Sequence, residues 1–158
     1  MTAPPAVYGQ FGQALAFAER TMTGILHEHL ARRGTKPETW YALQLIATRG
    51  PGLSRQALSR DLAGSRNVAT PAPELLARLE AEGLISGGAH VDLTAEGAAL
   101  HRRLREYVGG PTARLLSQFD IHDIETTVRT IQAITRRAAE EAAAEGPSQL
   151  SAGTPGRT

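Results

Sequence analysis

Arginines in the middle of the chain are the residues with the clearest chemistry in this sequence. Between residues 49 and 66 there are four Arg and one Asp, which gives this stretch a local charge of +3. Between residues 70 and 83 a single Arg is set against three Glu, a local charge of −2. The whole chain carries only +1, so the distribution is more informative than the total. Patches of this size are on the scale of contacts with phosphate groups.

Motifs for catalysis or metal binding are not found in the sequence. There is no nucleophile motif, no glycine-rich phosphate loop and no pair of carboxylates spaced for acid–base chemistry. We therefore expect a protein that is not an enzyme and carries no cofactor. His27 and His29 make a poor metal site, because side chains at i and i+2 point to different faces of a helix. The chain has no cysteine, which excludes disulfides and thiolate ligands.

The composition is typical of one globular domain with helical extensions. Of 158 residues, 41% are hydrophobic and 21% are charged. The N-terminus lacks the basic stretch and apolar run of a signal peptide. No segment approaches the roughly 18 consecutive apolar residues that a membrane span needs. The sequence therefore predicts a cytoplasmic protein that has no membrane partner.

Two long apolar stripes at helical spacing lie near the ends of the chain. The first runs along a helix predicted over residues 7–33, and the second along a helix that begins at Asp120. Both are too long for a small domain to cover, so they predict a helix-on-helix interface with a second copy of the chain. The stripes consist of Phe11, Leu15, Ala18, Met22, Ile25, Leu26 and His29, and of Ile124, Val128, Ile131, Ile134, Thr135 and Ala138.

Cap residues predict where the helices between these stripes begin and end. Gly34 is placed to end the first helix, and Thr35 with Glu38 has the spacing of a capping box for a second helix. Ser54 and Thr70 are placed to cap a third and a fourth helix. The fourth should bury the apolar residues Ala72, Leu75, Leu76 and Leu79.

The remaining elements are a hairpin and C-terminal helices. Residues 84–86 and 90–93 are short strand candidates around a Gly-Gly-Ala turn. Thr94 is placed to cap a helix that Gly109-Gly110-Pro111 should break or kink. Residues 146–158 lack periodicity and are expected to form a flexible tail.

This order of elements and four short motifs resemble the winged helix-turn-helix of the MarR family of transcriptional regulators. The family has a comparable RLE-x-x-GL run before its wing and an LT-x-x-G run after it. The resemblance covers about residues 7–144, and its strength lies in the ordered set. The motifs are TWYALQLIA (39–47), LSRQALSRDLAG (53–64), LLARLEAEGLI (75–85) and VDLTAEGAAL (91–100).

The resemblance implies a mainly α fold with a short β-hairpin wing, flanked by N- and C-terminal dimerisation helices. It implies a homodimer that offers two winged domains to a pseudo-palindromic site on double-stranded DNA. It also implies a small, aromatic or anionic ligand that releases the DNA. The corresponding domains are a dimerisation helix (1–34), the winged domain (35–100), C-terminal dimerisation helices (101–145) and the tail (146–158).

Candidate DNA-binding residues follow from the basic patch together with the resemblance. The arginines can contact phosphate or be solvated surface residues, and Arg78 can instead pair with Glu74 or Glu82 at i±4. The candidates are Arg55, Arg60, Ser65, Arg66, Asn67, Thr70, Arg78 and His90.

Three departures from the family pattern motivate a second hypothesis. The loop before the fourth helix is about three residues longer, that helix begins TPAPE, and the wing is cut to Gly-Gly-Ala-His, with His90 where an Arg is usual. The alternative is a winged-helix dimer that has lost DNA reading and binds or transforms a small molecule in an interdomain cavity. A plain protein-interaction module is a third possibility.

Candidate ligand residues are Tyr8, His29, Tyr41 and His101. His29 shares the N-terminal apolar stripe, so it is either a hydrogen-bonded histidine of the dimer interface or part of a ligand pocket with the other three. The basic cluster Arg102, Arg103 and Arg105 is compatible with flanking DNA or with a solvated helix face.

Overall fold

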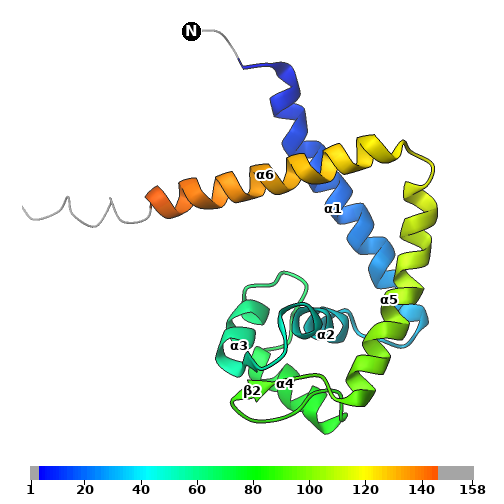
Figure 1. Ribbon diagram of the computed structural model, residues 1–158, viewed down its shortest axis with the longest axis vertical. Coiled ribbons are helices and arrows are strands. Elements are labelled where there is room, and N and C mark those ends of the chain that lie inside the picture. The colour runs from blue at the N-terminus through cyan, green and yellow to red at the C-terminus, as the bar shows by residue number, and fades with distance from the viewer. Residues whose placement is uncertain (1–3, 146–158) are drawn as a thin grey trace, which may run out of the picture. The chain divides into compact units, whose positions relative to one another are not determined.

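The structure, a computed structural model, describes residues 4–145 of the chain (Figure 1). The predicted flexible tail at 146–158 lies outside these residues. The chain divides into two compact units, one up to Gly110 and one from Pro111. The mainly α fold with a small antiparallel wing is confirmed. Its elements are α1 (Ala6–Arg32), α2 (Pro37–Arg49), β1 (Leu53–Ser54), α3 (Arg55–Ala63), α4 (Ala72–Ala81), β2 (His90–Val91), α5 (Ala95–Leu116) and α6 (Ile121–Glu145).

The core of the first unit lies between α2, α3, α4 and the wing (Figure 1). All four apolar residues predicted to face inward from α4 are buried, as are Leu58 and Leu62 of α3. Each large apolar side chain removed from water stabilises the fold by about 1.5–3 kcal/mol. This core therefore fixes the helix-turn-helix formed by α3 and α4.

A second, smaller apolar cluster connects α1, α2 and α5. Leu30, Trp40 and Leu104 are its buried members. Between α1 and α2 the chain reverses at Gly34, whose φ of 63° lies in the left-handed region that favours glycine. The N–H groups of Gly34 and Thr35 donate to the carbonyls of Ala31 and Leu30, so Gly34 ends the helix as predicted.

The wing contains one strand that the sequence did not indicate. The predicted arms of the hairpin meet at an antiparallel bridge between Ile85 and Leu93. In addition, β1 pairs with β2 in antiparallel register, Leu53 opposite Val91 and Ser54 opposite His90. A two-residue strand has no room for the alternation by which strands are recognised, so it escaped prediction.

Two of the predicted helix caps are wrong. α2 begins after Lys36 and α4 after Pro71, and neither of these N-cap residues caps its helix through a side chain. Proline at N1 of α2 and at N2 of α4 requires no N–H partner, which removes much of the need for a cap. Glu38 is consequently free for other contacts. The caps at Ser54 and Thr94 are confirmed, with N–H···Oγ distances of 3.5 and 3.0 Å.

Of the two outcomes expected at Gly109-Gly110-Pro111, the break is wrong, because α5 continues through Pro111 to Leu116, and the kink stays a prediction. In the second unit, Asp120 caps α6 by accepting the N–H of His122 at 2.8 Å. None of the 25 residues of α6 is buried. No helix among the described residues is long and apolar enough to cross a membrane.

Candidate functional site

Arg60 and Arg66 are exposed and unpaired on the helix-turn-helix. Arg60 lies in the last turn of α3, and Arg66 lies in the loop between α3 and α4. In the part of the chain that the structure describes, neither forms an ion pair. The hydroxyl oxygen of Ser65 accepts the N–H of Asn67 at 3.3 Å, which holds a turn around Arg66. Both guanidinium groups can therefore reach an external phosphate without breaking an internal contact.

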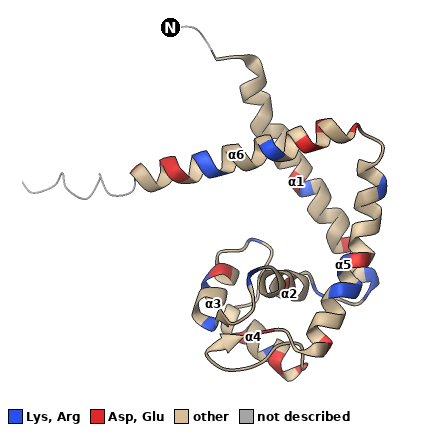
Figure 2. Cartoon of the chain, viewed as in Figure 1, with Lys and Arg blue, Asp and Glu red and all other residues tan. Residues whose placement is uncertain are grey.

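Other arginines of the basic stretch are already paired. Arg55 forms an ion pair with Glu80 of α4, and Arg49 forms one with Asp61 of α3. Figure 2 shows acidic and basic residues mixed along α3 and α4. The local charge of +3 that the sequence gives for this stretch is therefore partly neutralised in the fold.

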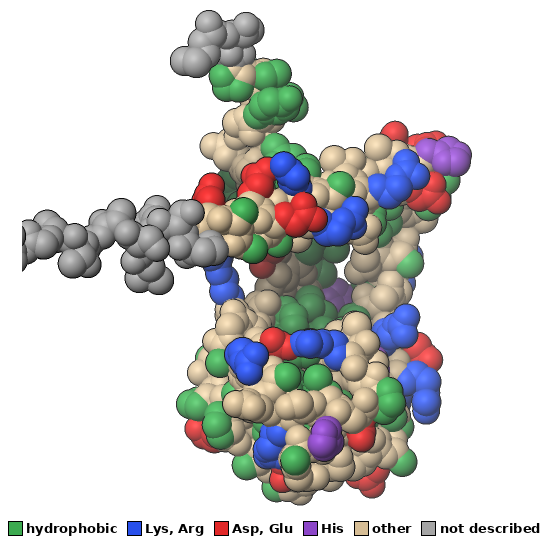
Figure 3. Space-filling view, turned by 60° about the vertical axis from the view of Figure 1, so that its left-hand side comes forward, with side chains coloured by type: hydrophobic (Ala, Val, Ile, Leu, Met, Phe, Trp, Pro, Cys, Tyr) green, Lys and Arg blue, Asp and Glu red, His purple; other side chains and the backbone are tan. Residues whose placement is uncertain are grey.

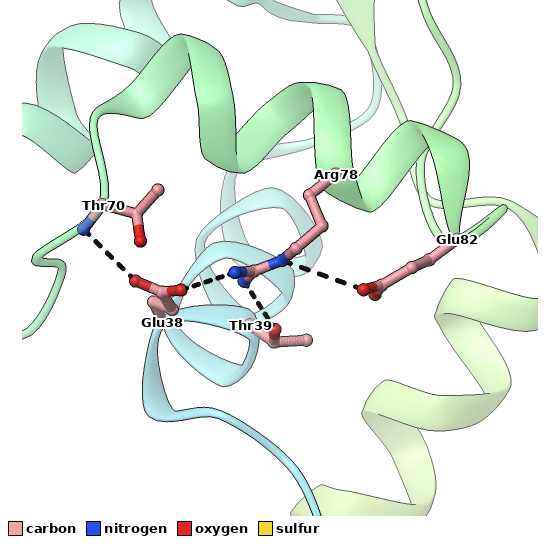
Figure 4. Close-up of polar contacts among 5 residues, drawn as sticks. All are labelled: Glu38, Thr39, Thr70, Arg78 and Glu82. Atoms are coloured by element: carbon pink, nitrogen blue, oxygen red, sulfur yellow. Dashed lines mark hydrogen bonds and ion pairs between the residues drawn. The ribbon is translucent and has the colours of Figure 1, made fainter.

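Arg78 lies at the centre of a polar cluster that also contains Glu38 and Thr39 of α2 (Figure 4). Its Nη1 donates to Glu38 Oε1 at 2.7 Å and its Nη2 to Thr39 Oγ1 at 3.3 Å. Its Nε lies 3.8 Å from Glu82, the i+4 partner expected as an alternative to DNA contact. The backbone N–H of Thr70 donates to Glu38 Oε2 at 3.3 Å. The structure thus gives Arg78 and the Thr70 N–H internal partners.

Glu38 is held in its charged form within this cluster. Its side chain is only 12% exposed. Burial raises the pKa of Glu38, but hydrogen bonds from Arg78 and Thr70 and the positive charge of Arg78 outweigh burial and lower the pKa overall. Nothing in the sequence indicated this contact, because Glu38 and Arg78 are 40 residues apart.

The solvent face of α4 is short and carries no basic side chain. Its exposed residues are Pro73, Glu74, Ala77 and Ala81, whereas Arg78, which the helical spacing also places on the outward face, is half-buried against α2. His90, at the start of β2, is also exposed. Direct hydrogen bonds to base edges from this helix are therefore limited to Glu74 as an acceptor.

The four predicted ligand residues do not gather into one site. Tyr8 is 68% exposed near the start of α1. His29 Nδ1 lies 2.8 Å from the Ile25 carbonyl, and its ring packs against Tyr107. Tyr41 and His101 belong to separate contacts, and each has its own environment.

Tyr41 and His101 each have a perturbed pKa. Burial, and then the negative charge of Glu19, raise the pKa of the Tyr41 hydroxyl, which lies 3.5 Å from His27 Nε2. Burial, and then the positive charge of Arg105, lower the pKa of His101. The His101 ring stacks on Trp40 and its Nε2 lies 2.7 Å from Gln44 Oε1. The lowered pKa favours the neutral form of His101, whose ring packs against α2.

Two hollows in the first unit have the size of small-molecule sites. One, of about 560 Å³, lies beside α5. Arg33 and Tyr107 both line this hollow, and the Arg33 guanidinium lies 4.0 Å from the centre of the Tyr107 ring. The other, of about 300 Å³, lies beside the loop that carries Arg66. The first is lined by Arg33, Thr35, Leu100, Arg103, Leu104, Glu106 and Tyr107. The second is lined by His27, Lys36, Pro37, Glu38, Arg66, Asn67 and Ala69.

Neither hollow was foreseen as a site from the sequence. Arg33 lies at the C-terminal end of α1, where cations are common because they interact favourably with the helix dipole, so it gave no signal of a site. Lys36 is an isolated lysine in the turn before α2 and gave no signal either. No group of three or more potential metal ligands occurs within residues 4–145.

Solved structures place this architecture among known proteins. The MarR family protein Rv2887 of Mycobacterium tuberculosis in complex with DNA is 25% identical, with a TM-score of 0.62 over 84% of this chain and 98% of that one. Its complex with salicylic acid is likewise 25% identical, with a TM-score of 0.57 over 84% and 99%. A MarR family protein from Bacillus stearothermophilus is 17% identical, with a TM-score of 0.73 over 87% and 99%.

This chain has the MarR-family winged-helix fold. No protein-family model matches the sequence, and no curated protein matches it. The agreement with solved MarR structures therefore rests on how the elements are arranged, with modest sequence identity. Within the MarR fold, α3 and α4 of this chain are the helix-turn-helix, and residues 84–93 with β1 form the wing.

Proposed function

We propose that this chain is a MarR-type transcriptional regulator that binds double-stranded DNA. The observation that carries the proposal is the pair of exposed, unpaired arginines, Arg60 and Arg66, on the helix-turn-helix of a MarR fold. Rv2887, solved in complex with DNA, supports it as a structural relative. Ser65, Asn67 and His90 remain candidate contacts because each lies near this surface or on the wing.

A homodimer is part of this proposal. Along α1 the apolar residues Phe11, Leu15 and Ile25 are 38–43% exposed, and α6 exposes Val128 and Ile134 at 47% and 43%. Figure 3 shows hydrophobic side chains at the surface of the N-terminal part of α1. Apolar seams of this length on long helices are covered in water by a partner surface. Two copies would place one winged domain over each half of a palindromic site.

Binding of a small ligand is the third part of the proposed function. The hollow of about 560 Å³ combines the apolar side chains of Leu100 and Leu104 with two arginines, Arg33 and Arg103, and one carboxylate, Glu106. Two cations against one carboxylate give an apolar hollow with a net positive charge, which is suited to an aromatic carboxylate. Rv2887 has been solved with salicylic acid, a molecule of this class. We therefore move the candidate ligand site from the four residues expected from the sequence to this hollow.

The alternative function, a winged-helix dimer that has lost DNA reading, is favoured by one observation. The exposed side chains of α4 are Pro73, Glu74, Ala77 and Ala81, which offer DNA one negative charge and no donor. This face reduces base readout without removing the phosphate contacts of Arg60 and Arg66. The two functions differ in whether the purified chain retards duplex DNA.

A gel-shift titration of the full chain tests the proposal. The DNA probes are the region upstream of its own gene and an unrelated duplex of the same length, at low and at near-physiological salt. A salt-sensitive shift that is stronger on the upstream region supports the regulator. No shift on either probe at low salt, from a preparation that is folded, would overturn it in favour of the alternative.

A further inference from the structure

The hollow beside the α3–α4 loop gathers two cations that have no internal partner. Lys36 is the N-cap residue of α2, and Arg66 lies in the loop that precedes α4. Both are exposed, and neither forms an ion pair within residues 4–145. By contrast, Arg49, Arg55 and Arg78 all have carboxylate partners. The two cations at this hollow are therefore not paired with a carboxylate.

One carboxylate does line the hollow, but its oxygens are engaged elsewhere. Glu38 Oε1 accepts from Arg78 at 2.7 Å, and Glu38 Oε2 accepts the Thr70 N–H at 3.3 Å. Both oxygens of Glu38 are thus turned to Arg78 and Thr70, and neither forms an ion pair with Lys36 or Arg66. The side chain of Asn67 and the ring of His27 add polar atoms to the same wall.

We infer that an oxyanion group, phosphate or carboxylate, binds in this hollow between Lys36 and Arg66. Lys36 and Arg66 both line one space of about 300 Å³ and bring an ammonium and a guanidinium to it as charge-assisted donors. The group comes from one of two sources, a backbone phosphate of bound DNA or a free anion. In either case Arg66 is the shared element, so a free anion held there competes with DNA for this arginine.

The first arm of the test uses the full chain without DNA, so its failure is separate from failure of the proposed function. Inorganic phosphate at pH 7.4 is titrated into labelled protein at constant ionic strength set with sodium chloride, and backbone amide shifts are followed by NMR. We expect saturable shifts centred on Lys36, Arg66 and Asn67, with half-saturation in the millimolar range.

Variants decide whether the binding is at this site. K36Q and R66Q should each weaken phosphate binding by about tenfold, the loss of one charge-assisted contact. R20Q, which removes an exposed arginine on α1 that does not line the hollow, should leave it unchanged. Shifts that do not saturate, or a loss in R20Q as large as in K36Q, overturn the inference.

The second arm separates the two sources and rests on the proposed DNA binding. Where the group is a DNA phosphate, K36Q lowers the magnitude of the salt slope of log K by about 0.9 for each subunit engaged. Where it is a free anion, K36Q leaves the salt slope unchanged. In that case phosphate inhibits DNA binding by the wild type more strongly than chloride does at equal ionic strength, and K36Q removes this difference.

Discussion

Glu38 Oε1 and Arg78 Nη1 lie 2.7 Å apart and join the first turn of α2 to the middle of α4 (Figure 4). The other oxygen of Glu38 accepts the backbone N–H of Thr70, one residue before the N-cap of α4. A single carboxylate therefore holds both the body of α4 and the loop that leads into it. The position of α4 depends on this carboxylate as well as on its buried leucines.

Replacing Glu38 with Gln should destabilise the first unit. The amide keeps the shape of the side chain but loses the charge, and it leaves Arg78 with Glu82 at 3.8 Å as its remaining acidic partner. We expect the free energy of unfolding to fall by about 1–3 kcal/mol, the cost of leaving a largely buried polar group without its partner. Urea denaturation measures this difference.

Glu74 provides the matched control on the same helix. Its side chain is on the exposed face of α4, so Glu74→Gln should change the free energy of unfolding by less than about 0.5 kcal/mol. Equal stability of Glu38→Gln and the wild type would mean that the contact contributes nothing to α4.

The contact between Glu38 and Arg78 should also make the stability of the protein depend on pH, and Glu38→Gln should remove this dependence. The pKa of Glu38 is lowered on folding from its usual value of about 4.5, so the folded chain binds fewer protons than the unfolded chain below that pH. The stability from this group is fully present above pH 4.5 and is lost as pH falls through the lowered pKa. Melting temperatures of the two proteins should therefore differ at pH 7 and converge in acid. A gap that stays constant from pH 7 to pH 3 would contradict this.

Gly97 should not tolerate a methyl group. A Cβ at this position would collide with the carbonyl oxygen of Leu84 and lie 2.9 Å from its carbonyl carbon. Gly97→Ala should therefore cost about 1–3 kcal/mol or more in unfolding free energy, because backbone must move.

Gly24, in the middle of α1, is the opposite case. Nothing lies within 4 Å of a Cβ there, so Gly24→Ala should raise stability by about 0.5–1 kcal/mol through its helix propensity. If Gly97→Ala left thermal stability unchanged or raised it, the close approach of α5 to Leu84 would be refuted.

A charge placed in the α1 seam should separate the proposed dimer. Leu15 is 43% exposed in the single chain, and we expect it to be buried between copies. Leu15→Glu should shift the protein from dimer to monomer at micromolar concentration, since an unpaired charge is costly to bury. Gln13→Glu adds the same charge off the seam and should leave the dimer intact. Analytical ultracentrifugation distinguishes the outcomes, and a wild-type monomer would remove the basis for the dimer.

The salt dependence of DNA binding should show how many of the unpaired arginines contact phosphate. If Arg60 and Arg66 supply the phosphate contacts, a dimer neutralises four phosphates, and log K should fall with log salt with a slope of about −3.6. If Arg55 and Arg78 also contributed, the slope would be about −7. Arg60→Gln should therefore flatten the slope by about 1.8. Arg55→Gln, whose guanidinium is paired with Glu80, should leave the slope nearly unchanged.

Local pattern was sufficient to predict most of the fold. The spacing of Leu75, Leu76 and Leu79 determines the buried face of α4, and Gly34 determines the end of α1. The predictions of helix caps and helix ends were wrong where a proline lies at or near the position concerned. Proline satisfied the first turns of α2 and α4 without a cap, and α5 accommodated Pro111 without ending.

The candidate site was less accessible to sequence reasoning because its contacts are distant in the chain. A stretch with four arginines predicts a basic patch, but which of them remain free depends on acids such as Asp61 and Glu80 that only folding brings near. The ligand site predicted from the sequence grouped tyrosine and histidine residues only because their side chains are of similar types. Tertiary contacts instead place them in separate pairs, such as His101 with Trp40.

The exposed surface of α4 consists of the rings and methyl groups of Pro73, Ala77 and Ala81, apart from one carboxylate. Inserted in a major groove, such a surface meets base edges through van der Waals contact, and the C5 methyl of thymine is its natural counterpart. An operator for this protein would then be distinguished by the positions of its thymines. Replacing those thymines with uracil, which pairs in the same way but lacks the C5 methyl group, would weaken binding.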